Sequence, residues 1–407
     1  MSVRKRTWVT RKGETKEAWI ADFTDGNGKR HIRTFPIKKG SPGSPKKMAD
    51  AYEASVAVAV NTGTHVALDG QTTIADAAEK WIKRVEANGM RNDGPAERAT
   101  VRQYREHIDL HIVPRVGKLK LVKLTKKDVE HFRDAVLKKG DGKDAPKPLS
   151  RAMAIKVLTS FKSLLKVAGV GHHAADVTLG NKKRDQHKLA IGHDIPTPAE
   201  IKRLIDASKD NLKKNAMLRT LAFTGLRASE LRGLRWRDID LTNNELHVGQ
   251  RADRYNDIGN PKTKESARTV PFGLLLSVVL KKWKLACPKG ELDLVFPTST
   301  GAVDYHKNVD RSLAPVMKAA NIVKEGGEPK YTGLHPFRHY FASWCINPKE
   351  RGGRQLTPKV VQTLMGHSSI VMTLDLYGHL FPSGDDRAAL AEDEKAALRP
   401  KKKEAAN

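Results

Sequence analysis

The chain contains 407 residues, of which 74 are Lys or Arg and 46 are Asp or Glu, giving a formal net charge of +28. Such an excess of positive charge favours a nucleic acid as partner and argues against a metabolic enzyme, although ribosomal, membrane-surface and merely well-solvated proteins are basic too. The length predicts two or three domains, because a single hydrophobic core stops growing at about 250 to 300 residues.

The cysteines and the apolar segments argue against several further classes of protein. Cys287 and Cys345 are the only cysteines, and neither belongs to a CxxC pair, so we expect no zinc site and no disulfide framework. No apolar run reaches the ~20 residues that span a bilayer, and the basic N-terminus lacks the apolar segment of a signal peptide. We therefore expect a soluble, intracellular protein.

Residues 1–65 are expected to form a small module of three strands and one helix. Short apolar runs are separated by Lys-Gly and Asp-Gly-Asn-Gly turns, which are typical of hairpins, and a helix is expected over 46–60. Trp8, Trp19 and Phe35 favour a packed face over a disordered charged tail. Eight basic residues have the distribution of a phosphate-binding set: Arg4, Lys5, Arg6, Arg11, Lys12, Lys29, Arg30 and Arg33.

Residues 72–170 are expected to be helical throughout. Apolar residues recur at helical spacing over 74–85 and again over 101–112, where the pattern stops at Pro114. Two further helices are expected before residue 170. The basic side chains on these helices suit contact with a DNA backbone, but they suit ordinary solvated faces equally well.

The remaining chain divides into a linker, a larger domain and a tail. A polar, basic run at 180–188 has no apolar periodicity and predicts a linker, whose bounds we place at 171–190. The domain at 191–383 begins with a helix start, in which Thr197 and Glu200 form a capping box. Residues 384–407 form a charged, Ala-rich tail that either frays or docks on a partner.

The domain at 191–383 contains a Thr-Gly-Leu-Arg segment between two apolar helices. Gly225 predicts a helix end, and Arg227 stands at the start of the next helix, where backbone N–H groups and a guanidinium can share one oxyanion. Glu230 lies one turn further on and can orient Arg227. Alone, this pattern is equally consistent with a helical hairpin that carries surface arginines.

A predicted hairpin follows, with strands at 245–249 and 268–272. Lys262 and Lys264 lie between its Gly-Asn-Pro turn and its second strand. A lysine in this position can reach a minor groove and protonate a departing oxygen. Without further context, a solvated lysine-rich turn is the simpler interpretation.

The segment from 334 to 380 contains the other candidate phosphate ligands. His335 and Arg338 are three positions apart on an expected helix, close enough to hold two oxygens of one phosphate. His367 follows Gly366, which predicts another helix end, and Tyr377 lies on the next helix. Taken alone, Tyr377 would be the last member of an apolar stripe.

Together and in this order, these pieces resemble the active site of tyrosine recombinases of the phage or integrative-element integrase type. Members of that family combine a TGLR box and a following Glu, a hairpin lysine, an HxxR box, a Gly-His pair and a tyrosine. The His-Pro-Phe-Arg box departs from the commoner His-Asp-Leu-Arg, and Lys262 remains an alternative to Lys264. The resemblance implies a catalytic set of Arg227, Lys264, His335, Arg338, His367 and Tyr377, supported by Glu230, with no metal and no cofactor.

The resemblance also implies a fold and a domain plan. The fold is expected to be mainly α with small β elements. Residues 1–65 would be an arm-type DNA-binding module, residues 72–170 a helical, SAM-like core-binding domain, and residues 191–383 a mixed, mostly α catalytic domain with a β hairpin. The two upstream assignments rest on layout and composition.

The implied reaction is the cutting and rejoining of DNA strands. Tyr377 would attack a phosphodiester to give a 3′-phosphotyrosyl intermediate, with its pKa lowered by the surrounding cations. Arg227 and Arg338 would hold the phosphate, and Lys264 would protonate the leaving 5′-oxygen. His335 would be the acid/base partner of Tyr377, and His367 a further phosphate donor.

The implied partners are double-stranded DNA attachment sites, bound by a homotetramer that holds two of them, together with a host DNA-bending protein and an excision factor. The expected location is the cytoplasm of a bacterial host, near the nucleoid and away from membranes. The main alternative is a catalytically inert DNA-binding regulator derived from a recombinase. A carboxylate-type transposase would need an acidic metal-binding array, which the motif-bearing segments lack, whereas a type IB topoisomerase would share the cleavage chemistry.

Overall fold

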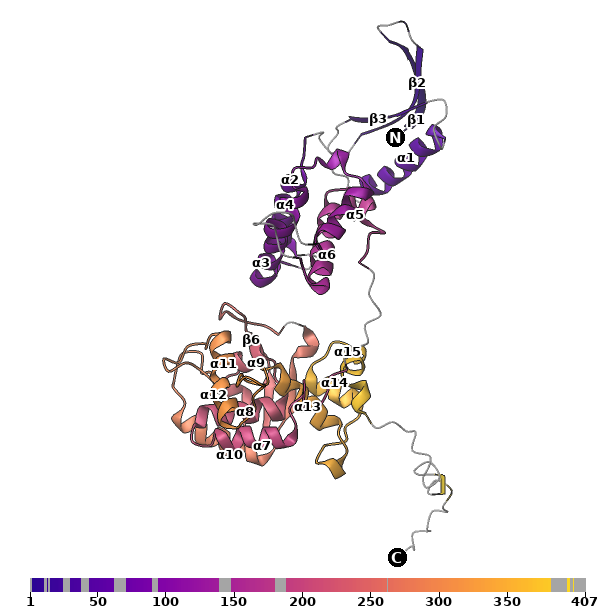
Figure 1. The fold of residues 1–407 in the computed structure, drawn as a ribbon. Coiled ribbons are helices and arrows are strands. Elements are labelled where there is room, and N and C mark those ends of the chain that lie inside the picture. Colours follow the sequence, from indigo (N-terminus) through magenta and orange to yellow (C-terminus); the bar gives the residue numbers. More distant parts are fainter. Residues whose placement is uncertain are drawn as a thin grey trace, which may run out of the picture. The chain divides into compact units, whose positions relative to one another are not determined.

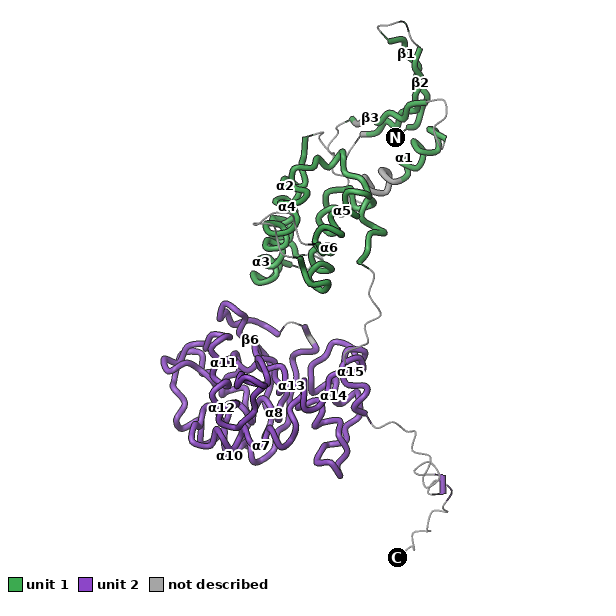
Figure 2. Tube along the Cα trace, in the orientation of Figure 1, with its two compact units in different colours: residues 1–182 green, residues 183–407 purple. Residues whose placement is uncertain are grey.

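The computed structural model describes residues 2–10, 13, 15–24, 30–37, 44–61, 71–89, 94–138, 148–179, 188–261, 263–381, 394–395 and 398. The chain divides into two compact units, residues 1–182 and 183–407 (Figures 1 and 2). The fold is mainly helical with small sheets, as the sequence predicts. Among the described helices, none is long and apolar enough to cross a membrane.

The first unit begins with the predicted three strands and helix. Strands β1 (Ser2–Val9), β2 (Thr15–Thr24) and β3 (Arg30–Pro36) form an antiparallel sheet in the order β1-β2-β3. Helix α1 (Pro45–Asn61) packs on this sheet through Tyr52, whose ring centroid lies 6.4 Å from that of Phe23 and 5.8 Å from that of Phe35. Aromatic contacts of this kind explain why so short a segment can hold a sheet together.

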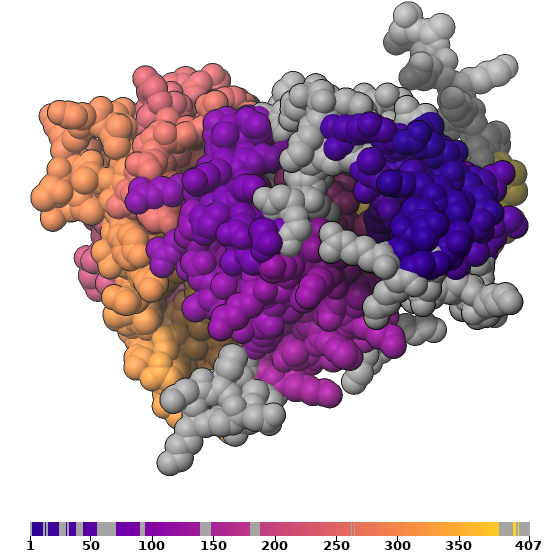
Figure 3. Space-filling view, turned by 90° about the horizontal axis from the view of Figure 1, so that it is seen from above, coloured from indigo at the N-terminus to yellow at the C-terminus, as the bar shows by residue number. Residues whose placement is uncertain are grey.

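The rest of the first unit, whose surface is purple to magenta in Figure 3, is helical and has a separate core. Trp81 and Ile82 of α2 and Phe161 of α6 are among its fully buried side chains. Threonine capping boxes begin α2 and α5, and Ser150 caps α6. The helices are α2 (Ile74–Asn88), α3 (Arg98–His107), α4 (Val113–Val116), α5 (Lys126–Ala135) and α6 (Arg151–Val167).

Two sequence-based boundaries in this unit were wrong. The helical run does not stop at Pro114, because a π-helical turn (Ile108–Ile112) leads directly into α4. The altered hydrogen bonding of such a turn accommodates a residue that lacks an N–H group. The predicted linker at 171–190 begins too early in the sequence, because Ala174 and Val177 are still buried in the core of the first unit.

The second unit is built around a helix that is buried on several sides. Helix α8 (Leu212–Thr224) packs against α10 (Leu274–Ala286) and α13 (His335–Ile346) (Figure 1). Its Thr220 and Thr224 hydroxyls donate to carbonyl groups one turn earlier in the same helix, so their burial leaves no donor unpaired. A helix of this kind, apolar on more than one face, belongs at the centre of a domain.

The remaining elements surround α8. Strands β4 (Ile239–Asp240), β5 (Glu245–Val248) and β8 (Arg268–Pro271) form an antiparallel sheet in that order, and β6 (Arg251–Ala252) pairs with β7 (Ile258–Gly259). The other helices are α7 (Pro198–Ala207), α9 (Ala228–Gly233), α11 (His306–Ser312), α12 (Ala314–Ala319), α14 (Pro358–Met365) and α15 (Ile370–Tyr377).

Candidate active site

A glycine positions the first arginine. Gly225 ends α8 in the left-handed conformation at φ 61°, and a Cβ atom there would lie 2.3 Å from Cδ1 of Phe341 on α13. Only glycine satisfies both the backbone and this close approach. The chain therefore turns sharply, and Arg227 becomes the N-terminal cap residue of α9.

Glu230 orients Arg227 through two hydrogen bonds. The backbone N–H of Arg227 donates to Oε2 of Glu230 at 2.9 Å, and Nη1 of the guanidinium donates to Oε1 at 2.6 Å. The carboxylate is buried, whereas the Arg227 side chain remains 30% exposed. One side of the guanidinium is thus fixed while the group stays accessible to a ligand.

A second arginine, which is buried and for which the sequence analysis predicted a strand but no role in the site, completes this ion pair. Nη2 of Arg268 donates to Oε2 of Glu230 at 3.0 Å, and both side chains are 3% exposed. Burial acts to raise the pKa of Glu230, but Arg268, and then Arg227, bring it down to about 2. The alternation of residues along the strand could have predicted this contact. Arg268 lies on the inward face of β8 together with Val270, and a buried charge requires a partner of opposite charge.

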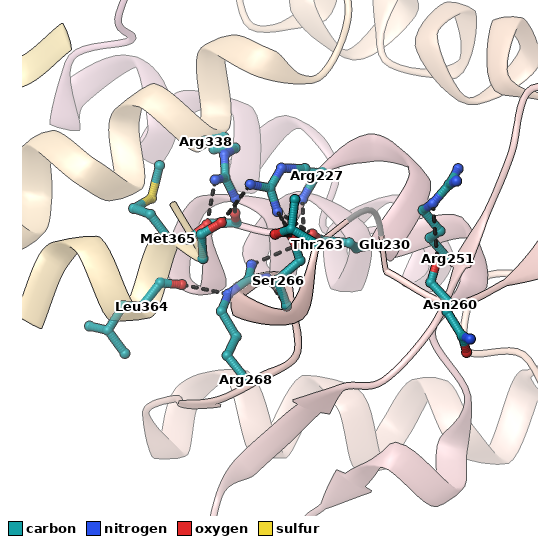
Figure 4. A network of polar contacts seen from close by, with 12 residues as sticks. Arg227, Glu230, Arg251, Asn260, Thr263, Ser266, Arg268, Arg338, Leu364 and Met365 are labelled. Atoms are coloured by element: carbon teal, nitrogen blue, oxygen red, sulfur yellow. Dashed lines mark hydrogen bonds and ion pairs between the residues drawn. The ribbon is translucent and has the colours of Figure 1, made fainter. Parts of the chain in front are cut away.

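The C-terminus of α14 binds three arginines (Figure 4). Its last carbonyl groups have no partner within the helix and carry the negative end of the helix dipole, so cations are stabilised there. Arg338 also donates to the carbonyl oxygen of Gly225 at the end of α8, which ties the two helix ends together. The α14 contacts are Arg268 Nε to Leu364 O at 2.7 Å, Arg338 Nη2 to Met365 O, and Arg227 Nη2 to Gly366 O at 2.7 Å.

The lysine-bearing turn is attached to the same arginines. Lys264 opens a 3-10 turn (Lys264–Ser266), whereas Lys262 lies outside the described residues. Oγ of Ser266 accepts from Arg227 Nη1 at 3.3 Å, and its carbonyl oxygen accepts from Arg268 Nη1 at 2.9 Å. The backbone that carries Lys264 is therefore held beside Arg227.

His367 follows the left-handed Gly366 and lies buried at the turn between α14 and α15. Its Nδ1 hydrogen-bonds to the hydroxyl of Thr373 at 2.9 Å, and its ring plane lies within 5° of that of Tyr377, with centroids 6.4 Å apart. Burial, and then the charges of Arg338, Arg227 and Arg268, lowers the pKa of His367 to about 3. The imidazole is therefore neutral at physiological pH.

Tyr377, at the end of α15, is 1% exposed. Its hydroxyl group lies 2.7 Å from Nδ1 of His339. Burial raises the pKa of Tyr377 to about 12, although the charge of Arg338 opposes the shift. The expected lowering of this pKa was wrong, because desolvation outweighs the nearby cations.

The histidine in contact with Tyr377 is also not the expected one. His335, the expected acid/base partner, is exposed at the start of α13, with its ring centroid 5.9 Å from that of His339. His339, one helical turn later, makes the hydrogen bond instead. The signal in the sequence was the spacing of four residues, which puts His335 and His339 on one helix face.

The basic set of the N-terminal module is only partly described. Arg11, Lys12 and Lys29 lie outside the described residues. Arg4 and Arg30 form ion pairs with Asp22, Lys5 pairs with Glu17 at 2.8 Å, and Arg33 lies 4.5 Å from the ring centroid of Tyr52. Arg6 is exposed on β1. Several members of the set thus have partners within the module.

Metal ligation finds no support in the described parts of the chain, where no group of three or more His, Cys, Asp or Glu side chains could hold an ion.

The second unit of the chain matches a known family, and the chain is similar to several known proteins. Residues 196–383 match the family model described as "Phage integrase family". A tyrosine recombinase XerC-like protein of Caldanaerobacter subterraneus subsp. tengcongensis is 26% identical, with 93% of this chain and 96% of the relative covered. The ICEBs1 integrase of Bacillus subtilis is 26% identical, with 68% of this chain and 72% of that protein covered.

A solved structure supports the fold. The Tn1549 transposon integrase, in complex with transposon right end DNA, aligns with a TM-score of 0.59 and 21% identity over 80% of this chain and 100% of that chain. The family match spans the domain that contains Arg227, Arg338 and Tyr377. Residues 196–383 of this chain therefore match the phage integrase family, and the relatives with which the chain aligns include a tyrosine recombinase and an integrase.

Proposed function

We propose that the chain is an integrase that inserts a mobile element or prophage into DNA, and excises it by the reverse reaction, through a 3′-phosphotyrosine at Tyr377. The observation that carries this proposal is the convergence of Arg227 and Arg338 on the adjacent carbonyl groups of Gly366 and Met365, beside His367. Two guanidinium groups and an imidazole next to one tyrosine suit a phosphodiester as substrate.

Electrostatic stabilisation is the main task of the site in this proposal. Arg227 and Arg338 hold the nonbridging oxygens, and their existing hydrogen bonds fix both guanidinium groups before DNA arrives. Donors fixed in this way are worth on the order of 100-fold or more each in rate. His367, whose Nδ1 is hydrogen-bonded to the hydroxyl of Thr373, is the additional donor, through Nε2 in the tautomer that has its proton there.

Proton transfer involves the leaving group and the nucleophile. Lys264 is the general acid for the 5′-oxygen, with Lys262 as the alternative. The phosphotyrosyl bond conserves the energy of the phosphodiester, so the cycle requires neither ATP nor a metal ion. Because Tyr377 is 1% exposed, a scissile phosphate reaches its hydroxyl only after the segments that cover this group move aside.

The proposed partners follow from the same reaction. The substrates are double-stranded attachment sites, two of which are held by a homotetramer, with a host bending protein and an excision factor as further partners. Residues 1–65 bind arm-type sites and residues 72–170 bind the core site, so two linked modules raise avidity on one DNA. The net charge of +28 supports contact with DNA phosphates.

Covalent trapping on nicked attachment-site DNA tests the proposal. We expect the wild-type protein to form an adduct that survives a denaturing gel, and Tyr377→Phe to form none. Tyr340→Phe, which changes another buried tyrosine of the same domain, is the matched control and should retain the adduct. DNA binding by the wild-type protein without any adduct would instead support an inert regulator.

A further inference from the structure

The reacting atom of Tyr377 already has a hydrogen-bond partner on a neighbouring helix. Its Oη lies 2.7 Å from Nδ1 of His339, and the two ring centroids are 5.8 Å apart. Tyr377 is buried and His339 is half-buried, so the contact is shielded from solvent. This distance is short enough for direct proton transfer.

We propose that His339, rather than His335, takes the proton from Tyr377 when the tyrosine attacks DNA and gives it back when the tyrosine leaves. The inference rests on the proposed integrase function and assigns one catalytic residue within it. His335 is exposed one turn earlier on α13, whereas Nδ1 of His339 contacts Oη of Tyr377.

The step is balanced without a cofactor. Oη of Tyr377 forms a bond to phosphorus while the bond from phosphorus to the 5′-oxygen breaks. The phenolic proton moves to Nδ1 of His339, and the 5′-oxygen takes a proton from the lysine. In the rejoining step the 5′-hydroxyl attacks, its proton returns to the lysine, and the proton on His339 returns to the departing tyrosine oxygen.

The groups around His339 keep it neutral at rest, as a proton acceptor must be. Burial, and then the charges of His335 and Arg338, lowers the pKa of His339 to about 4, with Asp194 opposing the shift. Tyr377 and His367 face it from α15 and from the turn before that helix. A phosphodiester bound between Arg227 and Arg338 adds negative charge, which makes the imidazole more basic when the substrate is in place.

A purely structural role is the competing explanation, since a buried tyrosine hydroxyl needs some hydrogen-bond partner. His339→Gln separates the two roles, because an amide oxygen can still accept a hydrogen bond but cannot take a proton. With full-length protein on nicked attachment-site DNA, we expect this variant to bind DNA normally and to form adduct about 100-fold more slowly. His247→Gln, an exposed histidine on β5, is the matched control and should react at the wild-type rate.

Sulfur substitution at the leaving oxygen identifies which proton transfer is affected. A 5′-bridging phosphorothiolate leaves without protonation, because a thiol is far more acidic than an alcohol. We expect this substrate to restore cleavage by the acid-deficient lysine variant, Lys264→Ala or Lys262→Ala, and not by His339→Gln. Restoration of His339→Gln would overturn the proposal, because the residue would then act on the leaving group.

Chemical rescue keeps the test decisive if His339→Gln folds poorly. Added imidazole should accelerate adduct formation by His339→Ala, since it can occupy the vacated space and accept the proton. A rate that does not respond to imidazole, or a wild-type rate for His339→Gln, would overturn the assignment of His339. Absence of adduct from the wild-type protein would instead refute the integrase function itself.

Discussion

At the scale of single residues, the site depends on paired charges in a buried setting. Glu230 and Arg268 are each 3% exposed, and Arg227 completes their ion pair from the surface. Removing one partner from such a group leaves a buried charge uncompensated, which costs more than the pair contributes. The ionisation of Glu230 should therefore be visible in the stability of the domain.

Glu230→Gln should change the dependence of stability on pH. The folded-state pKa of Glu230 is about 2, below the ordinary value of 4.5 for a glutamate, so its contribution is complete above pH 4.5 and is lost as pH falls toward 2. The contribution amounts to at most about 3 kcal/mol. We expect the unfolding free energy of the wild type to exceed that of Glu230→Gln at pH 7, and the gap to narrow by pH 3.

Denaturant unfolding at the two pH values measures this difference. Glu79→Gln is the control, because Glu79 pairs with Arg105 on the surface and is 53% exposed. Exposed pairs of this kind contribute little, so this variant should follow the wild type at both pH values. A gap between wild type and Glu230→Gln that stays constant with pH would contradict the assigned pKa.

At the scale of elements, the end of α14 organises the site. Gly366 takes the left-handed conformation at φ 61°, and a Cβ atom there would lie 2.9 Å from Nη1 of Arg268. That guanidinium cannot yield easily, because it is bound to Glu230, Ser266 and Leu364. The helix end and the arginines therefore depend on one another.

Gly366→Ala should be both less stable and slower in adduct formation. Gly352 offers a matched control, since its φ is 75° and an added Cβ atom would have no described atom within 4 Å. Backbone strain alone should cost Gly352→Ala about 1 kcal/mol, and Gly366→Ala should lose more and also react more slowly. Equal stability losses with wild-type adduct rates for both would show that Arg268 is free to move.

Local signals in the sequence predicted the ends of several helices. Features that depend on long-range contacts or on altered backbone hydrogen bonding were not predicted. The capping box of Thr197 and Glu200 and the left-handed Gly225 and Gly366 are confirmed, because each depends on a few neighbouring residues. The boundary at Pro114 was wrong, because a π turn changed the local hydrogen bonding.

Within the site, the residue pair that is close in sequence was predictable and the distant pairs were not. Glu230 lies three residues after Arg227, and its orienting contact follows from helix geometry. Arg268 reaches Glu230 across 38 positions, and His339 reaches Tyr377 across 38 positions as well. Such contacts depend on the packing of α13, α15 and β8, which the sequence pattern does not define.

At the scale of the whole molecule, the chain has separate hydrophobic cores in its two units. All the residues proposed for chemistry lie in residues 183–407, whereas the N-terminal module has its own sheet and helix. Binding and cleavage should therefore be separable by deletion.

Deletion of residues 1–65 should weaken integration between two attachment sites while leaving cleavage of a nicked core site close to the wild-type rate. In the proposed function, the arm-type module contributes avidity on DNA and no reacting group. Integration is scored by product formation and cleavage by adduct formation on the same preparation. An equal loss of both activities would contradict the assignment of the module.

Mapping the attached residue and strand tests the central claim most directly. Trypsin should release a peptide running from Val360 to Arg387, in which Tyr377 is the only tyrosine. With nicked attachment-site DNA labelled upstream of the cleavage point, we predict that the labelled 3′ end is linked to this peptide through Tyr377 and that the downstream strand is released with a 5′-hydroxyl. A linkage at another residue, or attachment through the 5′ end, would contradict the account.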